Sequence, residues 1–187
     1  MGIRYFQLII WRLTTGTGGF FLGFLLLPGL LLLALLLQVT VTDMIQIRGV
    51  VPDLVFLLVV FYAFVRGRRE GAFWGYVAGL LQDLVTGHYF GLNALSMMAA
   101  GYLVGWCEGR VYKESSLVVT VVAGLSFLAG QMVHYLLLAF LGVAVPPGIA
   151  FLRVIFPAAL YNVLLAPIFY RRFYRMYVKG WFRFDQY

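Results

Sequence analysis

The chain has 187 residues, of which 63% are hydrophobic and 11% are charged, and its formal net charge is +7. Soluble domains carry about 25% charged residues, so this composition excludes an ordinary soluble protein and indicates a polytopic integral membrane protein. Loops that face the cytoplasm and anionic lipid account for the positive charge, and we expect no nucleic-acid partner. Little chain remains for a second domain, so residues 1–187 are interpreted as one membrane domain.

Apolar stretches of membrane-spanning length follow one another, separated by polar or glycine-rich breaks. Residues 1–17 have the spacing of an amphipathic helix that lies on the membrane surface. The basic and aromatic tail, 171–187, is interpreted as an interfacial anchor. The predicted fold class is all-α, a polytopic bundle of six transmembrane helices. The six spans are expected at about 20–41, 50–65, 72–86, 92–112, 117–141 and 149–170.

The break before the second span ends in Val51, Pro52 and Asp53. Proline is favoured in the first helical turn, where its missing N–H is not needed, and aspartate suits the positive end of the helix dipole. A helix is therefore expected to begin here. The stretch from Arg66 to Glu70 is expected to be a polar loop before the third span.

Basic residues are distributed unevenly between the two sides of this predicted bundle. With six spans both termini lie on one side, and twelve of the fourteen Lys and Arg residues then fall on that side. Arg48 and Arg153 fall on the other side. Since loops rich in Lys and Arg remain in the cytoplasm, both termini are predicted to be cytoplasmic.

Two ladders of small residues occupy the third and fourth spans. They consist of Gly71, Gly75 and Gly79 in one span and Gly101, Gly105 and Gly109 in the other. Residues four apart share one face of a helix, and in lipid small residues let helix backbones approach closely. Such packing explains the glycines, but it does not explain the polar residues Asp83 and Asn93 at the matching ends of the two ladders.

Asp83 is an ionisable residue inside a predicted span, which is costly and calls for a partner. The predicted topology places it on the outer side with Asp53, Asn93 and Arg153. One interpretation of this cluster is a set of helix caps with one ion pair. The other is a docking face or a small cavity open to the outside. For the ion pair we expect Asp83 with Arg153 at matched depth, and Asp53 is the rival partner of Arg153.

No motif for nucleotide binding or for zinc-dependent hydrolysis is present, and no catalytic residue, metal or cofactor is expected. His88 and His134 have no clustered carboxylates or cysteines, so a metal site is not predicted. Gln131 and His134 lie three apart on one helix face. They form either an interhelical hydrogen bond or the lining of a small pocket.

Four short stretches resemble, in this order, the bacterial rod-shape protein family MreD. They are Val51-Pro52-Asp53, Arg66-Gly67 with Glu70-Gly71, Gly79 to Asp83 with Gly87, and Gly91 to Leu95. The resemblance covers residues about 50–112, and size, predicted spans and predicted cytoplasmic termini agree over the rest. Each stretch is short and rich in glycine, so the specificity comes from the ordered set.

The resemblance implies a non-enzymatic subunit of the cell-elongation machinery in the bacterial cytoplasmic membrane. MreD-like proteins work with MreC, which has one transmembrane span and a large outer domain, and with MreB filaments. They act beside the glycan polymerase RodA and a class B penicillin-binding protein in peptidoglycan synthesis. The resemblance also implies a fold similar to the six-span substrate-binding subunits of energy-coupling-factor vitamin transporters, although fold does not fix function.

Two other functions are compatible with the sequence. A vitamin-binding transporter subunit needs a roomy cavity lined by polar groups of several helices, for which Gln131 and His134 are the available side chains. A small intramembrane enzyme that acts on lipid would use Asp83 and His88. Copurification with an MreC-like partner, against binding of a radiolabelled vitamin, separates the transporter role from the elongation role.

The charge distribution generates a test of orientation. We predict that Arg68 lies in the cytoplasm and that Tyr89, between the third and fourth spans, faces outward. In a Cys107→Ser background, an impermeant thiol reagent added to whole cells should label the Tyr89→Cys variant. It should leave the Arg68→Cys variant unmodified until the cells are opened. The reverse labelling pattern would contradict the predicted orientation.

Overall fold

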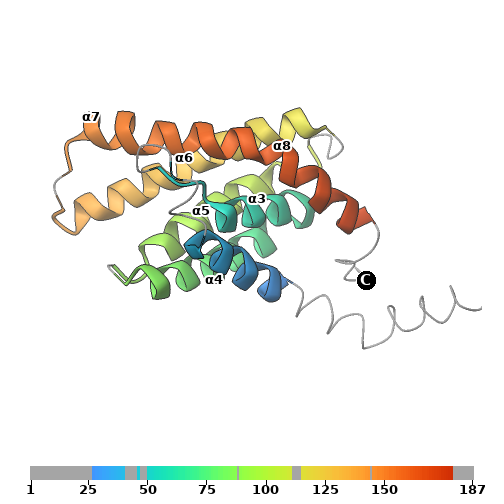
Figure 1. The fold of residues 1–187 in the computed structure, drawn as a ribbon, viewed down its shortest axis with the longest axis horizontal. Helices are drawn as coiled ribbons and strands as arrows, with labels where there is room; N and C mark the ends of the chain where they lie inside the picture. Colours follow the sequence, from blue (N-terminus) through green and yellow to red (C-terminus); the bar gives the residue numbers. More distant parts are fainter. Residues whose placement is uncertain are drawn as a thin grey trace, which may run out of the picture.

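The computed structural model of the protein describes residues 27–40, 46, 50–87, 89–110, 115–143 and 145–178. The regular elements formed by these residues are helices, which confirms the all-α prediction (Figure 1). They are Leu27–Thr40, α3 (Leu54–Arg66), α4 (Arg68–Thr86), α5 (Leu92–Trp106), α6 (Ser116–Phe140), α7 (Pro147–Ile149), the π-helical turn η1 (Ala150–Ile155) and α8 (Phe156–Val178). The predicted surface helix at 1–17, His88 and the end of the tail lie outside the described residues.

Helix α3 forms the centre of the structure. The stretch from Leu54 to Val65 contains no charged residue, glycine or proline, and a helix that is apolar all round is typically buried. Ten of the thirteen residues of α3 are buried. The helix packs against α4, α5, α6 and α8 (Figure 1). The Leu27–Thr40 helix adds three leucines to the same core.

Helices α4 and α5 form an antiparallel hairpin with the most extensive contact between any two described helices. Gly87 (φ +68°) and Gly91 (φ +94°) lie in the turn between them, in a backbone region that favours glycine. The N–H of Gly87 donates to the carbonyl oxygen of Asp83 (3.0 Å) and closes the end of α4. The chain therefore reverses direction within a few residues.

The glycines of the two ladders face the opposite helix across this hairpin. Gly71 lies opposite Gly101, Gly75 opposite Met97, Gly79 opposite Asn93 and Ala94, and Gly105 opposite Arg68. A methyl group on any of these five glycines would approach the opposite helix more closely than side chains can. Both ladders are thus used to pack α4 on α5, and neither is left as an open groove for a partner helix.

Gly109 does not belong to this contact, so its prediction as a packing residue is wrong. Helix α5 ends at Trp106, and the predicted span that ran to residue 112 is correspondingly shorter as a helix. Gly109 has a φ of +76°, and apart from its chain neighbours no atom of the described residues lies within 4 Å of the position that a Cβ would take. The four-residue spacing continues in the sequence, but residues four apart share a face only within a helix, and α5 has already ended.

The predicted polar loop between Arg66 and Glu70 is also wrong, because a single residue, Gly67, separates α3 from α4. Its φ of +93° allows the sharp corner. Arg66 Nε lies 2.9 Å from Glu70 Oε2, and the hydroxyl of Tyr62 donates to the same oxygen (2.7 Å). These contacts hold the end of α3 against the first turn of α4.

Helices α6 and α8 run antiparallel along one side of the bundle (Figure 1). Among the described residues, Ser116–Phe140 and the continuous helical segment Pro147–Val178 are long and apolar enough to cross a membrane. Leu27–Thr40 and α3 are apolar but shorter, so six separate crossings stay a prediction. Helix α8 continues to Val178, so the first part of the predicted tail is an extension of this helix, and its role as an interfacial anchor stays a prediction.

The arginines of the described residues gather at one end of the bundle. Seven of the eight lie at the α3–α4 corner, after α5 or near the end of α8, namely Arg66, Arg68, Arg69, Arg110, Arg171, Arg172 and Arg175. Arg153 is in η1, which directly follows α7, and α7 lies at the opposite end of the bundle (Figure 1). This separation is what the charge-based orientation requires, and the orientation itself stays a prediction.

The glycine-lined contact between α4 and α5, here called the glycine seam, generates a test with a matched control. Gly79→Ala should lower the melting temperature of the detergent-purified protein, because its methyl group meets the backbone at Asn93 and Ala94. Overpacking of this kind costs about 1–3 kcal/mol. Gly29→Ala adds the same methyl group where no described residue outside its own helix turn lies within 4 Å, and it should be neutral or slightly stabilising. Equal melting temperatures of Gly79→Ala and Gly29→Ala would contradict the close approach of α4 and α5 at Gly79.

Candidate functional site

Asp83 closes the turn at one end of the α4–α5 hairpin. Its side chain comes from the last turn of α4 and is 1% exposed. Its carboxylate accepts hydrogen bonds from the N–H groups of Gly91 (2.9 Å), Asn93 (3.2 Å) and Ala94 (3.2 Å). Gly91 is the N-cap of α5 and has no side chain that could accept hydrogen bonds from the first turn. The carboxylate of Asp83, from the neighbouring helix, therefore caps α5 at the positive end of its dipole.

The prediction of an ion pair between Asp83 and Arg153 is wrong. Arg153 is exposed on η1, and neither Asp83 nor Asp53 forms an ion pair with it, although the structure describes all three residues. Three N–H donors and a helix dipole already stabilise the Asp83 carboxylate, so it needs no cation. Of the two interpretations of this residue, the helix cap is the one that the geometry supports.

Asp53 stands at the start of α3 as its N-cap, where the sequence placed a helix start. Its Oδ1 accepts hydrogen bonds from the N–H of Phe56 (2.8 Å) and from Nε2 of Gln82 (2.9 Å). Its own N–H donates to Oδ1 of Asn162 (3.0 Å). Gln82 and Asn162 are buried, so this polar cluster ties the start of α3 to α4 and α8 at once.

A polar cavity of about 320 Å³ lies beside the Asp83 turn. Its lining comes from α4, α5, α6 and the α4–α5 turn, and consists of Thr86, Tyr89, Leu92, Asn93, Gln131 and His134. Gln131 and His134 thus line one pocket together with Asn93. The volume is at the lower limit of small-molecule sites, and the side chains offer hydrogen-bond donors and acceptors.

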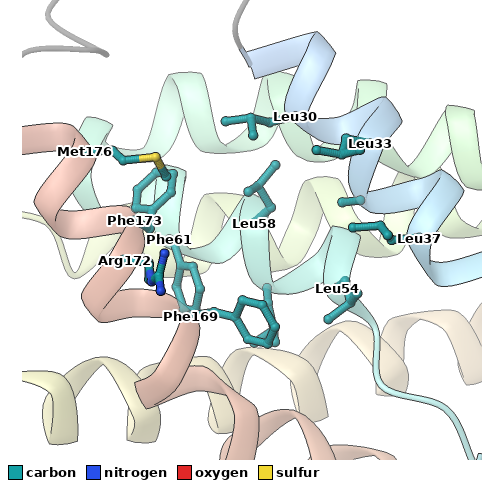
Figure 2. A pocket seen from close by; sticks show the side chains of 12 residues that line it. Leu30, Leu33, Leu37, Leu54, Leu58, Phe61, Phe169, Arg172, Phe173 and Met176 are labelled. Atoms are coloured by element: carbon teal, nitrogen blue, oxygen red, sulfur yellow. The ribbon is translucent and has the colours of Figure 1, made fainter. Parts of the chain in front are cut away.

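An apolar groove of about 200 Å³ lies on another side of the molecule, between the Leu27–Thr40 helix, α3 and α8 (Figure 2). Each helix lines it with residues spaced three and four apart, which form one stripe per helix. The stripes are Leu30, Leu33, Ala34 and Leu37, then Leu54, Leu57, Leu58 and Phe61, then Phe169, Arg172, Phe173 and Met176. Arg172 is the single charged residue in this lining.

The sequence interpretation missed Gln82 and Asn162 as partners of Asp53, and it missed the groove. Gln82 lies next to Asp83 in a predicted span, and a polar residue in an apolar stretch was the available signal. The stripes of the groove carried no such signal, because apolar positions three and four apart occur throughout a membrane helix. Only their arrangement in space distinguishes them.

The groove and the polar cavity are candidate binding surfaces of the chain. In the part of the chain that the structure describes, no three His, Cys, Asp or Glu residues gather where they could hold a metal ion. The carboxylates of the half-buried Asp53 and the buried Asp83 already accept two and three hydrogen bonds respectively from this chain. The groove offers shape and apolar contact, and the cavity offers a few polar groups.

Comparison with known proteins gives one match. The sequence model of a family described as rod shape-determining protein MreD matches residues 19–179. No curated protein and no solved structure matches the chain. The matched residues include both carboxylates, the polar cavity and all three stripes of the groove.

The capping role of Asp83 generates a further test. Asp83→Ala should lower the melting temperature strongly, because three N–H groups lose their acceptor and each costs about 1–3 kcal/mol when buried without one. The melting temperature of Asp83→Asn should lie between those of Asp83→Ala and the parent, since the amide oxygen of Asn still accepts hydrogen bonds. Arg153→Gln should be nearly neutral, and its effect should add to that of Asp83→Asn. A coupling between these two substitutions would restore the rejected ion pair.

Proposed function

Because the chain belongs to the MreD family of rod shape-determining proteins, we propose that it is a non-enzymatic membrane subunit of the cell-elongation complex. In that complex it binds MreC and so supports peptidoglycan synthesis by RodA and a class B penicillin-binding protein, together with MreB filaments. The complex lies in the bacterial cytoplasmic membrane, with both termini of this chain in the cytoplasm.

The observation that carries the proposal is the apolar groove (Figure 2). MreC-like proteins have one transmembrane helix, and three apolar stripes along neighbouring helices suit the side chains of such a helix. A cavity of about 150 Å³ admits a benzene ring. The groove, at about 200 Å³, therefore has room for one or two large apolar side chains of the partner.

The glycine ladders are not free to bind MreC, which supports the groove as the surface that does. Small residues at a four-residue spacing are a favoured contact for a partner helix in lipid, but here α4 and α5 use them against each other. The groove is different, because Leu33, Leu37 and Phe169 in its lining are 52%, 46% and 44% exposed on the surface of the chain. Burial of these side chains under a partner helix would remove apolar surface from lipid and gain packing contacts.

The proposal is tested by copurification with MreC. Ala34→Trp places a large ring in the groove, and it should reduce recovery of coexpressed MreC in detergent by about tenfold or more, since a clash of this size exceeds 1.4 kcal/mol. Val121→Trp is the matched control, because Val121 is 60% exposed on α6, away from the groove. It should recover MreC like the parent.

A crosslinking experiment keeps the test valid if Ala34→Trp fails to fold. A photoreactive amino acid at Leu37, in the groove, should crosslink to the transmembrane segment of MreC. The same group at Leu125, which is 64% exposed on α6, should not. Crosslinking from Leu125 alone would move the partner to the α6 face, and no MreC at either position would contradict the proposed function.

The polar cavity favours a second candidate, a ligand-binding subunit of an energy-coupling-factor type transporter. Its support is the set of polar side chains from three helices, Thr86, Asn93, Gln131 and His134, around about 320 Å³. The test is binding of radiolabelled vitamins to the full chain. Binding that is lost in Gln131→Leu would favour this candidate over the elongation role.

A further inference from the structure

A further cavity, of about 300 Å³, lies at the arginine-rich end of the bundle, where α6 begins and α8 approaches its end. It is lined by Ser116, Tyr170, Arg171, Tyr174 and Arg175. Arg171 and Arg175 are one helical turn apart on α8 and so share a face. The Nε of Arg175 donates to the carbonyl oxygen of Arg171 (3.2 Å), which holds its guanidinium group close to the helix.

Ser116 gives this cavity a feature that a row of surface arginines lacks. Its Oγ is buried and has no hydrogen-bond partner among the described residues. A buried hydroxyl without a partner costs free energy, so rotation of this side chain toward a ligand atom in the cavity would remove a penalty. Ser116 is also the first residue of α6, and the N-cap Ser115 provides no side-chain hydrogen bond to the first turn. The positive end of the α6 dipole therefore acts at the same cavity.

We propose that this cavity binds the phosphate group of an anionic phospholipid. Arginine binds phosphate through two parallel hydrogen bonds, and two arginines one turn apart can hold one phosphate between them. The hydroxyl of Ser116 donates to a third phosphate oxygen or to a headgroup hydroxyl. The site does not depend on MreC or on the groove, because Arg172 and the groove lie on another face of α8.

The surroundings of the cavity identify the source of the phosphate as a lipid. Leu164 and Ile168 precede Arg171 and Arg175 at spacings of four, three and four, so all four residues share one face of α8. Leu164 and Ile168 are 63% and 64% exposed, and Leu117, next to Ser116 on α6, is 79% exposed. Both helices belong to the segments long enough to cross a membrane. Acyl chains can lie on this apolar surface while the headgroup enters the cavity.

The test measures lipid binding to the full chain in detergent by native mass spectrometry. The probes are dioleoylphosphatidylglycerol, dioleoylphosphatidylcholine and inorganic phosphate. The parent should bind phosphatidylglycerol in preference to the zwitterionic lipid. Arg171→Gln with Arg175→Gln should weaken phosphatidylglycerol binding, by roughly tenfold for each arginine removed. Arg68→Gln with Arg69→Gln loses the same charge at the same end of the molecule, from two exposed residues, and should bind like the parent.

Ser116→Ala distinguishes a built site from general charge attraction. Without lipid, this variant should melt at the temperature of the parent or higher, because a hydroxyl without a partner has been removed. With phosphatidylglycerol it should bind more weakly than the parent. Unchanged lipid binding in Ser116→Ala would overturn the proposal.

Three other outcomes would also overturn it. Equal weakening in the two double variants would show a diffuse charge effect, and equal binding of phosphatidylcholine would remove the selection for anionic lipid. Inorganic phosphate that binds as well as phosphatidylglycerol would make the cavity a site for free anions. If the Gln double variant fails to fold, Arg171→Lys with Arg175→Lys replaces it. That variant keeps the charge but loses the bidentate geometry, and it should bind phosphatidylglycerol more weakly than the parent.

Discussion

The close approach of α4 and α5 is the constraint on which the rest of the structure depends. Five glycines let the two backbones meet, and Asp83 satisfies three N–H groups at the closed end of the hairpin. Asp83 is 1% exposed, and a buried carboxylate is tolerated only where the chain supplies its hydrogen-bond partners. The glycine seam sets the distance between the helices, and Asp83 fixes where each of them ends.

The hairpin in turn positions the central helix. Gly67 joins α4 directly to α3, and Glu70 bonds both Arg66 and Tyr62 across that corner. At its other end, α3 is tied to α4 and α8 through Asp53, Gln82 and Asn162. Helix α3 has thirteen residues, about 20 Å at the helical rise, which is shorter than the hydrocarbon layer of a membrane. It can be short because it is surrounded by protein rather than by lipid.

This arrangement separates the surfaces available for binding. The glycine-lined contact between α4 and α5 and the carboxylates of Asp53 and Asp83 are occupied by the chain itself. Among the described residues, a groove, a polar cavity and a basic cavity are left. Their chemistry differs, because the first is almost entirely apolar, the second offers neutral polar groups, and the third combines two arginines with a buried hydroxyl. The proposed role in a shape-determining complex would use these surfaces, and the family match covers the residues that line all three.

The sequence by itself determined the helical class, the family, the helix start at Asp53 and the position of the glycine ladders, because each depends on local composition or spacing. It could not determine which surfaces face each other. Whether a carboxylate meets an arginine or a helix terminus depends on the register of two helices, and only the tertiary structure decided that Asp83 meets the start of α5. The same reason explains the failure at Gly109, where the spacing continues past the end of the helix. The groove and the cavities could likewise not be predicted from the sequence. Each is formed by residues of more than one helix, and no single helix sequence carries a signal for it.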